Sequence, residues 1–327
     1  MMYSKAYHDK DISNINFLIT GGAGFIGSNI VEYLLKFGAK HVRVLDNLSN
    51  GYKENITEFE SKSNFEFING DIRKLGDCEK AVEGMDIVLH QAALGSVPRS
   101  IDDPIKSNEV NVSGFLNMLV ASKNSETVSR FVYAASSSTY GDSPNLPKVE
   151  HTIGKPLSPY AVTKYVNELY ADVFAKTYGM EIIGLRYFNV FGPKQSPQGA
   201  YAAVIPLFMK ALKDKEPPTI NGDGEQTRDF TFVENAVQAN IKAAFANKEA
   251  VNQVYNVAFG ERISLNELWA TLQNAADTEL DASYGPPRQG DVKDSLADID
   301  KARKLLGYKP EFDVQKGLKV TWNYFKE

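Results

Sequence analysis

Tyr160 and Lys164 lie four residues apart and follow a run of three serines, Ser136 to Ser138. On a helix, residues at this spacing share one face. A free phenol has a pKa of about 10 and is a poor base at neutral pH, but a nearby ammonium stabilises the phenolate and lowers that pKa. The phenolate takes a proton from an alcohol while a hydride leaves the same carbon, and a nearby serine hydroxyl relays the proton. The alternative is an ordinary amphipathic helix with a half-buried tyrosine and a solvated lysine.

A glycine-rich turn near the N-terminus gives this chemistry a context. Gly21, Gly24 and Gly27 follow a strand expected over residues 16–20 and open a helix expected over residues 25–37. Glycines allow a tight turn and a close approach of a pyrophosphate to the backbone. The helix N-terminus adds N–H groups and the positive end of a dipole. In this setting the turn predicts a dinucleotide site, and together with the tyrosine and lysine it indicates hydride transfer with a nicotinamide cofactor.

Two acidic residues refine the prediction. Asp46 ends the second expected strand, where a carboxylate binds a ribose 2′-hydroxyl and repels a 2′-phosphate. No basic residue follows in Asn47 to Gly51, so NAD is favoured over NADP. The alternative for Asp46 is a turn residue at a strand end. Asp71 follows the third expected strand and either holds the adenine amino group or makes an Asx-type turn.

Apolar segments alternate with helical patterns through the first half of the chain. Further strands are expected at 41–46, 65–69, 86–90, 130–135 and 181–186, and long helices at 104–122 and 159–178. This alternation predicts an α/β fold, a Rossmann-like doubly wound parallel sheet. After Pro193 loops dominate, with helices expected at 204–213, 233–245, 265–276 and 315–325.

We expect a dinucleotide-binding domain over residues 1–188, with a return of the chain to it around 230–257, and a smaller, loop-rich substrate domain over residues 189–327. Loops of the second domain are expected over the carboxyl ends of the strands, where open α/β sheets bind ligands.

Composition excludes several classes of protein. The 327 residues are 43% hydrophobic and 24% charged, as in ordinary globular proteins. A net charge of -5 argues against nucleic acid as a main partner. No apolar run approaches a membrane span, and the polar start lacks a signal-peptide core, so we expect a cytoplasmic location. The single Cys78 is expected to pack in a helix, and the four scattered histidines predict no catalytic metal.

These motifs together resemble the extended short-chain dehydrogenase/reductase family, and within it the UDP-sugar 4-epimerases. The resemblance covers nearly the whole chain. It rests on the glycine-rich turn and on Leu45-Asp-Asn47, Gly70-Asp-Ile72, His90-Gln-Ala-Ala93, Ser158-Pro-Tyr160, Arg186-Tyr-Phe-Asn-Val190, Arg228-Asp229 and Arg288-Gln-Gly-Asp291. Ala93 to Ser100 and Ala135 to Gly141 are similar to the bacterial UDP-N-acetylglucosamine 4-epimerases. The resemblance implies a tightly bound NAD, a UDP-sugar substrate and a role in surface-polysaccharide synthesis.

The resemblance also implies roles for individual residues. Tyr160 would be the base, Lys164 its activator and a ligand of the nicotinamide ribose, and Ser136 the proton relay, shared with Ser137. The cofactor would contact Gly21, Gly24, Phe25, Ile26, Gly27, Asp46, Asn47, Ser49, Gly51, Asp71, Ile72, Gln91, Ala92, Ala93, Asn111, Tyr160, Lys164 and Tyr187. The substrate would contact Gly95, Ser96, Ser136, Ser138, Asn189, Gln195, Ala203, Val204, Asn221, Arg228, Arg288, Asp291 and Ser295.

Within that set, Asn221 would face the uracil, Arg228 and Arg288 would bind the diphosphate, and Asp291 would hold the uridine ribose. For the arginines, surface salt bridging is the alternative. Two departures from the galactose epimerases bear on specificity. Gly95 and Ser295 align with a lysine and a tyrosine of that group, and the small side chains leave room for an N-acetyl group. Such a roomy site discriminates weakly against a plain hexose.

Three other activities compete with UDP-N-acetylglucosamine 4-epimerisation. UDP-glucuronate 4-epimerisation is the nearest, because Arg99 could meet a carboxylate. A nucleotide-sugar dehydratase needs an acid and a base beside the catalytic serine, and no carboxylate occurs there before Asp142. A non-catalytic dinucleotide sensor usually lacks the tyrosine–lysine pair.

A homodimer is expected from the resemblance, through a four-helix interface made by residues 104–122 and 159–178 and their copies. Apolar residues on these helices either belong to that interface or face the sheet. The residues in question are Val110, Phe115, Val166 and Tyr170.

Overall fold

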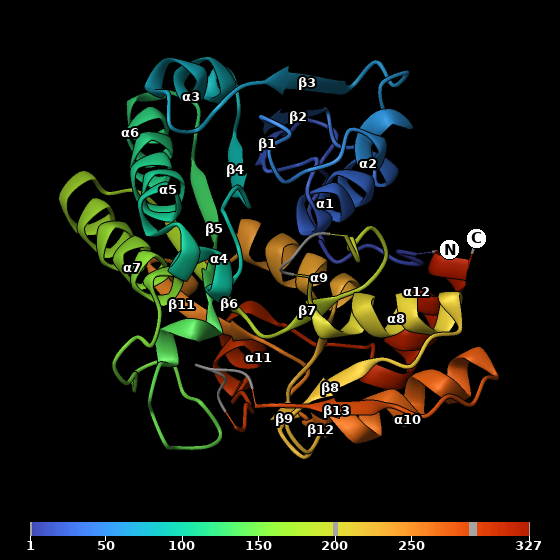
Figure 1. Ribbon diagram of the computed structural model, residues 1–327. Coiled ribbons are helices and arrows are strands. Elements are labelled where there is room, and N and C mark those ends of the chain that lie inside the picture. Colours follow the sequence, from blue (N-terminus) through green and yellow to red (C-terminus); the bar gives the residue numbers. More distant parts are fainter. Residues whose placement is uncertain (1, 199–201, 288–292, 327) are drawn as a thin grey trace.

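A seven-stranded parallel sheet forms the centre of the molecule, as seen in the computed structural model, which describes residues 2–198, 202–287 and 293–326 (Figure 1). Its strands lie in the order β11-β6-β5-β4-β1-β2-β3. They are β1 (Asn16–Thr20), β2 (His41–Asp46), β3 (Phe65–Asn69), β4 (Ile87–His90), β5 (Arg130–Ser136), β6 (Ile182–Tyr187) and β11 (Gln253–Val257). The order reverses between β1 and β4, and such a switch point opens a crevice at the carboxyl ends of the strands.

Helices cover both faces of this sheet. In Figure 1, α3 (Leu75–Val82), α6 (Phe115–Asn124) and α7 (Pro159–Tyr178) lie on one face, and α1 (Phe25–Lys36) and α9 (Val233–Ala244) lie on the other. Successive side chains of β1 point to opposite faces of the sheet, and both sets are apolar, which explains why helices cover both faces. Ile19 packs into the core on the α1 and α9 face, whereas its neighbour Leu18 packs into the core on the opposite face. The predicted Rossmann-like α/β class is therefore confirmed.

The helix expected over residues 104–122 is interrupted. It consists of α5 (Pro104–Asn108), a π-helical turn at Glu109–Gly114, and α6. The π turn carries Asn111, whose side chain binds the backbone of Leu94 through both of its polar atoms, at 2.7 and 3.1 Å. π turns of this kind are frequent at functional sites. Hydrophobic periodicity carries no signal for one, because it reports the buried face and not the hydrogen-bond pattern.

The twenty-residue helix α7 has caps at both ends. The Ser158 side chain accepts a hydrogen bond from the Ala161 N–H, Pro159 begins the first turn, and Gly179 ends the helix in the left-handed conformation at φ 68°. This arrangement of serine, proline and glycine is a strong start and stop signal. It fixes Tyr160 in the first turn, directly above the carboxyl end of β5.

The C-terminal half builds a third hydrophobic core around Phe208, Trp269 and Leu318. Its helices are α8 (Val204–Asp214), α10 (Leu265–Ala276), α11 (Asp300–Leu306) and α12 (Val314–Lys326). Its paired short strands are β7 (Val190–Phe191) with β10 (Thr231–Phe232), β8 (Thr219–Asn221) with β13 (Ser283–Gly285), and β9 (Thr227–Arg228) with β12 (Ile263–Ser264). The remaining helices are α2 (Glu54–Thr57), α4 (Val97–Asp102) and the 3₁₀ turns Ser137–Tyr140 and Lys248–Ala250.

Two segments beyond residue 188 return to the central sheet, one as a helix that packs on it and one as a strand of it. Helix α9 packs against α1 and the sheet, and β11 pairs in parallel with β6 along its whole length. Strand β11 is absent from the elements expected above, although it falls in the expected return of the chain. The two-domain boundary at residue 188 stays a prediction. Among the described helices, none combines the length and apolar character that crossing a membrane requires.

Candidate active site

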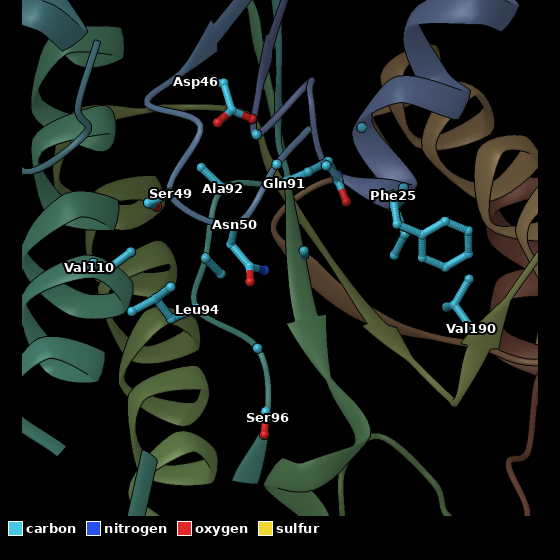
Figure 2. Close-up of a pocket in the computed structure, with 18 of the residues that line it drawn as sticks. Phe25, Asp46, Ser49, Asn50, Gln91, Ala92, Leu94, Ser96, Val110 and Val190 are labelled. Carbon is cyan, nitrogen blue, oxygen red and sulfur yellow. The ribbon is translucent and has the colours of Figure 1, made fainter. Parts of the chain in front are cut away.

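A cavity of about 620 Å³ opens at the carboxyl edge of the parallel sheet (Figure 2). Its wall comes from the segments at the carboxyl ends of β1, β2, β3, β4, β5 and β6, together with α4, Tyr160 and Lys164 of α7, and described residues within 189–198 and 202–203. The glycine-rich turn, Asp46 and the tyrosine–lysine pair, which are far apart in the sequence, therefore surround one space.

The glycine-rich turn is packed so closely that side chains are excluded. A Cβ at Gly27 would lie 2.2 Å from the carbonyl oxygen of Gly21, and a Cβ at Gly21 would lie 2.7 Å from the backbone nitrogen of Ala92. Within the described residues, no side chain caps α1, which begins after Gly24. Its N-terminal amides and positive dipole end thus face the cavity and suit the pyrophosphate of a dinucleotide.

Asp46 lies at the rim of the same cavity, in the upper part of Figure 2. Its carboxylate accepts hydrogen bonds from the backbone N–H groups of Ala23 at 3.0 Å and Leu48 at 2.8 Å. Burial nevertheless raises the pKa of Asp46. The carboxylate has the turn role that was the alternative, and it also faces the space where a ribose is expected.

Asp71 also lines the cavity, and its carboxylate is engaged locally. It accepts from the Arg73 side chain at 2.6 Å and from the Arg73 backbone N–H at 2.9 Å, and hydrogen bonding to Arg73 lowers the pKa of Asp71 to about 2. Asn47 donates to it at 3.1 Å. The Asx-type turn is therefore present, and the adenine contact stays a prediction.

Lys164 is almost fully buried, with 3% of its surface exposed, and its ammonium donates to the carbonyl of Ala134 at 2.9 Å. Burial lowers the pKa of Lys164 to about 8. Its Nζ lies 6.0 Å from the centre of the Tyr160 ring. In the protein without ligands, burial raises the pKa of Tyr160, opposed by a hydrogen bond to Ser136. In this state, therefore, the pKa of Tyr160 is raised by desolvation, and the lowering by Lys164 that the sequence predicts is not seen.

Ser136 is oriented by its own neighbours. Its hydroxyl oxygen accepts from the Ser138 backbone N–H at 3.1 Å and from the Ser138 hydroxyl at 2.8 Å. Because both bonds use the Ser136 oxygen as acceptor, its single hydrogen remains for Tyr160. Ser138 lies outside the cavity lining among the described residues and supports Ser136, whereas Ser137 lines the cavity.

Most of the predicted cofactor residues line the cavity, as do Gly95, Ser96, Asn189, Gln195 and Ala203 among the predicted substrate residues. Other predicted contacts are not among the described lining residues. Asn111 is buried behind Leu94, and Arg228 donates to the carbonyls of Thr227 and Lys293. The rest of this group are Ser138, Val204, Asn221 and Ser295. Their ligand roles stay predictions. Arg288 and Asp291 lie outside the described residues.

Several lining residues were missed from the sequence. Asn50, Leu94, Val110, Val190 and Lys194 all line the cavity, and Figure 2 labels the first four. Asn50 lies in the loop already singled out after β2, so its place in the chain was a usable signal. Lys194 forms ion pairs with Glu32 at 2.9 Å and Glu58 at 3.3 Å, contacts that only the tertiary structure brings together.

Comparison with known proteins places this geometry among enzymes. Residues 17–258 match the NAD dependent epimerase/dehydratase family. A putative UDP-glucose 4-epimerase of Methanocaldococcus jannaschii is 38% identical over 94% of this chain and 98% of its own. The structure of a UDP-N-acetylglucosamine 4-epimerase from Methanobrevibacter ruminantium, in complex with UDP-N-acetylmuramic acid, superposes with a TM-score of 0.90 at 39% identity, covering 96% and 98% of the two chains. UDP-glucuronic acid 4-epimerase from Bacillus cereus, bound to UDP-glucuronic acid and NAD, has a TM-score of 0.88 at 32% identity, covering 95% and 99%.

Proposed function

Because this chain belongs to the NAD dependent epimerase/dehydratase family, we propose that it is a UDP-sugar 4-epimerase that interconverts UDP-N-acetylglucosamine and UDP-N-acetylgalactosamine. NAD is its cofactor, and the UDP-sugar 4-epimerase activity is supported by relatives that match over nearly their whole length. The choice of the acetylated sugar is the finer part of the proposal.

The residues around the cavity fit a dinucleotide. The closely packed turn at Gly21 and Gly27 gives a pyrophosphate room against the backbone, and Asp46 lies beside the space expected for a ribose. Lys164 and Tyr187 line the deeper wall. When bound, NAD supplies a reversible hydride acceptor at the sugar carbon. Because the epimerisation leaves no net redox change, the cofactor has no need to exchange between turnovers.

The acid–base work falls to Tyr160 and Ser136. Tyr160 takes the proton of the C4 hydroxyl and gives it back when the sugar has turned to present its other face. Ser136 directs its hydrogen at the Tyr160 oxygen and stabilises the phenolate. The Lys164 ammonium adds a positive charge 6.0 Å from the centre of the Tyr160 ring. All three groups are needed in both directions, because the same oxygen is deprotonated and reprotonated.

Small residues on the sugar side of the cavity carry the specificity proposal. Gly95, Ser96, Ala202 and Ala203 line the cavity, and we assign them to the side that holds the sugar. A Cβ at Gly95 would have no atom of the described chain within 4 Å, so the wall there is open. An N-acetyl group at C2 needs such space, and a lysine side chain at this position would fill it.

UDP-glucuronate 4-epimerisation is the second candidate, and one observation favours it. Arg99 lines the cavity, and a guanidinium is a good partner for a sugar carboxylate. However, both terminal nitrogens of Arg99 donate to the side-chain oxygen of Asn50, each at 3.1 Å. A uronate would have to compete with that contact, which is why we rank this activity second.

Side-by-side turnover separates the two candidates. Purified protein, with no NAD added, is supplied with UDP-N-acetylglucosamine, UDP-glucose or UDP-glucuronate, and the nucleotide sugars are separated by chromatography. We expect UDP-N-acetylgalactosamine as the dominant product. Turnover of UDP-glucuronate alone would establish the second candidate, and no epimer from any of the three sugars, even after NAD is then supplied, would refute the proposed activity.

A matched pair of variants tests the role of Gly95. Gly95→Lys is expected to lower turnover of UDP-N-acetylglucosamine far more than turnover of UDP-glucose. Gly76→Lys, outside the cavity and also without a described atom near its added Cβ, serves as the control. An equal loss with both sugars would contradict the assignment of Gly95 to the N-acetyl group.

A further inference from the structure

Three side chains form a closed ring of hydrogen bonds behind the cavity wall. Tyr187 donates its hydroxyl to the side-chain oxygen of Gln91 at 3.0 Å, and Gln91 donates from Nε2 to the side-chain oxygen of Asn240 at 3.0 Å. Asn240 completes the ring by donating from Nδ2 to the Tyr187 hydroxyl at 2.7 Å. Gln91 and Tyr187 line the cavity, whereas Asn240 is fully buried on α9, on the far side of this wall.

The direction of every bond in this ring follows from one backbone carbonyl. Asn240 Nδ2 also donates to the Ala236 carbonyl, one turn earlier on α9, at 2.8 Å. A carbonyl only accepts, so the Asn240 atom facing it must be the nitrogen, and the opposite atom must be the oxygen. Gln91 must then present its nitrogen to Asn240 and its oxygen to Tyr187. Tyr187 in turn must give its only hydrogen to Gln91.

This direction decides what the wall offers to a ligand. Both hydrogens of the Asn240 amide and the only hydrogen of Tyr187 are used within the ring and on α9. Towards the cavity, Tyr187 therefore acts as an acceptor, and Gln91 retains one N–H as a donor. Gln91 directly precedes Ala92, whose backbone contacts the Gly21 turn, so the wall belongs to the dinucleotide side of the cavity (Figure 2).

We propose that Asn240 is a positioning residue that sets the hydrogen-bond polarity of the Gln91 and Tyr187 wall, so that the wall presents one acceptor and one donor to the bound dinucleotide. This inference rests on the proposed function only in taking the ligand of the cavity as NAD. Without Asn240, the Gln91 amide could turn over and the Tyr187 hydroxyl could donate into the cavity. The wall would then no longer present a fixed acceptor at Tyr187 and a fixed donor at Gln91. Binding of the dinucleotide would weaken, because buried polar groups without matched partners are costly.

NAD binding to the ligand-stripped protein tests the inference without relying on turnover. Asn240→Asp keeps the shape of the side chain but removes both of its donors. We expect it to weaken NAD binding by about tenfold in calorimetric titration. UDP binding, measured in saturating NAD, is expected to change less than about twofold, because the ring lies on the dinucleotide side.

Asn235→Asp is the matched control. Asn235 is also buried on α9, but its side chain binds the backbone of Glu311 and Phe312, away from the cavity. It is expected to lower the melting temperature without the selective loss of NAD affinity. A selective loss of NAD affinity in both variants, or in neither, would overturn the inference, as would parallel loss of NAD and UDP binding in Asn240→Asp.

A second variant covers the case in which Asn240→Asp does not fold. Tyr187→Phe breaks the same ring from the cavity side and is expected to weaken NAD binding to a similar degree. Where both single variants fold, the double variant should lose little more than either alone, since each breaks the same ring. Additive losses, or unchanged NAD binding in Tyr187→Phe, would refute the ring as the cause. Failure of the wild-type protein to bind NAD would instead refute the proposed function.

Discussion

Desolvation dominates the electrostatics of the tyrosine–lysine pair in the ligand-free protein. Burial raises the pKa of Tyr160 and lowers the pKa of Lys164 to about 8, so both shifts disfavour the charged forms, although Lys164 stays mostly protonated at neutral pH. Opposite shifts in neighbouring groups are typical of catalytic sites. The charged pair needed for catalysis therefore depends on how substrate and cofactor change the surroundings of these two side chains.

The lowered pKa of Lys164 predicts a pH dependence of stability. The folded protein loses this proton at about pH 8, whereas the unfolded chain keeps it up to about 10.5, so the unfolded state binds more protons between these values. Stability conferred by Lys164 must then rise with pH across that window, by at most about 1.4 kcal/mol per pH unit. Urea unfolding of ligand-free wild type and Lys164→Met should show the wild type gaining relative to the variant from pH 8 to 10. If the free energies of unfolding of the wild type and Lys164→Met changed in parallel with pH, the lowered pKa of Lys164 would be contradicted.

Removal of the Tyr160 hydroxyl tests its role as base. Tyr160→Phe is expected to lower the epimerisation rate by about 10²- to 10⁴-fold, the usual range for loss of an acid–base group. NAD content and melting temperature should change little, because the ring of Tyr160 remains. Initial rates from chromatography give the first quantity, and absorbance of released cofactor gives the second. A rate within fivefold of wild type would show that another group takes the proton.

At the scale of single residues, the sequence motifs predicted many of the residues that line the cavity but few of the residues that hold them in position. Tyr160, Lys164, Asp46 and the glycine turn belong to motifs that, taken together in their order along the chain, indicate their chemistry. Asn240 carries no such signal, because in the sequence a buried helical asparagine cannot be told from any other asparagine until its partners are known. The pKa shifts were equally out of reach, since the burial that causes them is a property of the folded chain.

Among the secondary-structure elements, the turn between β1 and α1 tolerates little change, because its glycines are closely packed. Gly27→Ala would place a methyl group 2.2 Å from the Gly21 carbonyl oxygen. We expect a loss of about 1–3 kcal/mol in the free energy of unfolding from overpacking, together with weaker NAD binding. Denaturant unfolding and calorimetric titration measure the two effects.

Gly76→Ala is the control for that substitution. Gly76 also lies in the first turn of a helix, α3, and its added Cβ would have no described atom within 4 Å. Alanine there should be neutral or stabilising by up to about 1 kcal/mol, because glycine is a poor helix residue. Equal effects of the two substitutions would show that the contact with Gly21 is unimportant.

The elements themselves were largely predictable, for a physical reason. Strands buried on both faces are nearly continuous apolar runs, and β1 and β2 were expected at their observed bounds. Short strands such as β9 and β12 were missed because two residues carry no periodicity. Strand β11 was missed because Gln253 and Asn256 interrupt its apolar run. The Asn256 side chain is satisfied by tertiary contacts, since it donates to the Lys148 and Asp298 carbonyls and accepts from the Tyr140 hydroxyl.

At the scale of the whole molecule, the two helices expected at a dimer interface leave apolar side chains exposed. Of the residues first considered for it, Phe115 is fully buried against the sheet and Val110 lines the cavity. The exposed large apolar residues on and beside these helices are instead Ile101, Ile105, Leu157, Val162, Leu169, Val173 and Tyr178. Val162, Leu169 and Val173 are spaced to share one face of α7. An unpaired apolar surface of this kind is typical of an interface.

The dimer remains a prediction that light scattering can test. The wild-type protein at micromolar concentration is expected to have twice the monomer mass. Leu169→Glu should shift the mass towards the monomer, because it places a charge in the proposed interface. Leu207→Glu on α8 is the control, since Leu207 is similarly exposed, at 45% against 50% for Leu169. A monomeric wild type, or equal effects of the two substitutions, would contradict the proposed interface.

The most direct test of the proposed function is to follow the hydrogen at C4 of the sugar from substrate to product. UDP-N-acetylglucosamine carrying deuterium at C4 is incubated with the protein in ordinary water, and the UDP-N-acetylgalactosamine formed is analysed by mass spectrometry and NMR. We predict that the product retains deuterium at C4. The hydride that leaves C4 goes back to the same carbon, and Tyr160 exchanges only the proton of the C4 hydroxyl. Loss of the deuterium to water, or a dehydrated product, would contradict 4-epimerisation at this site.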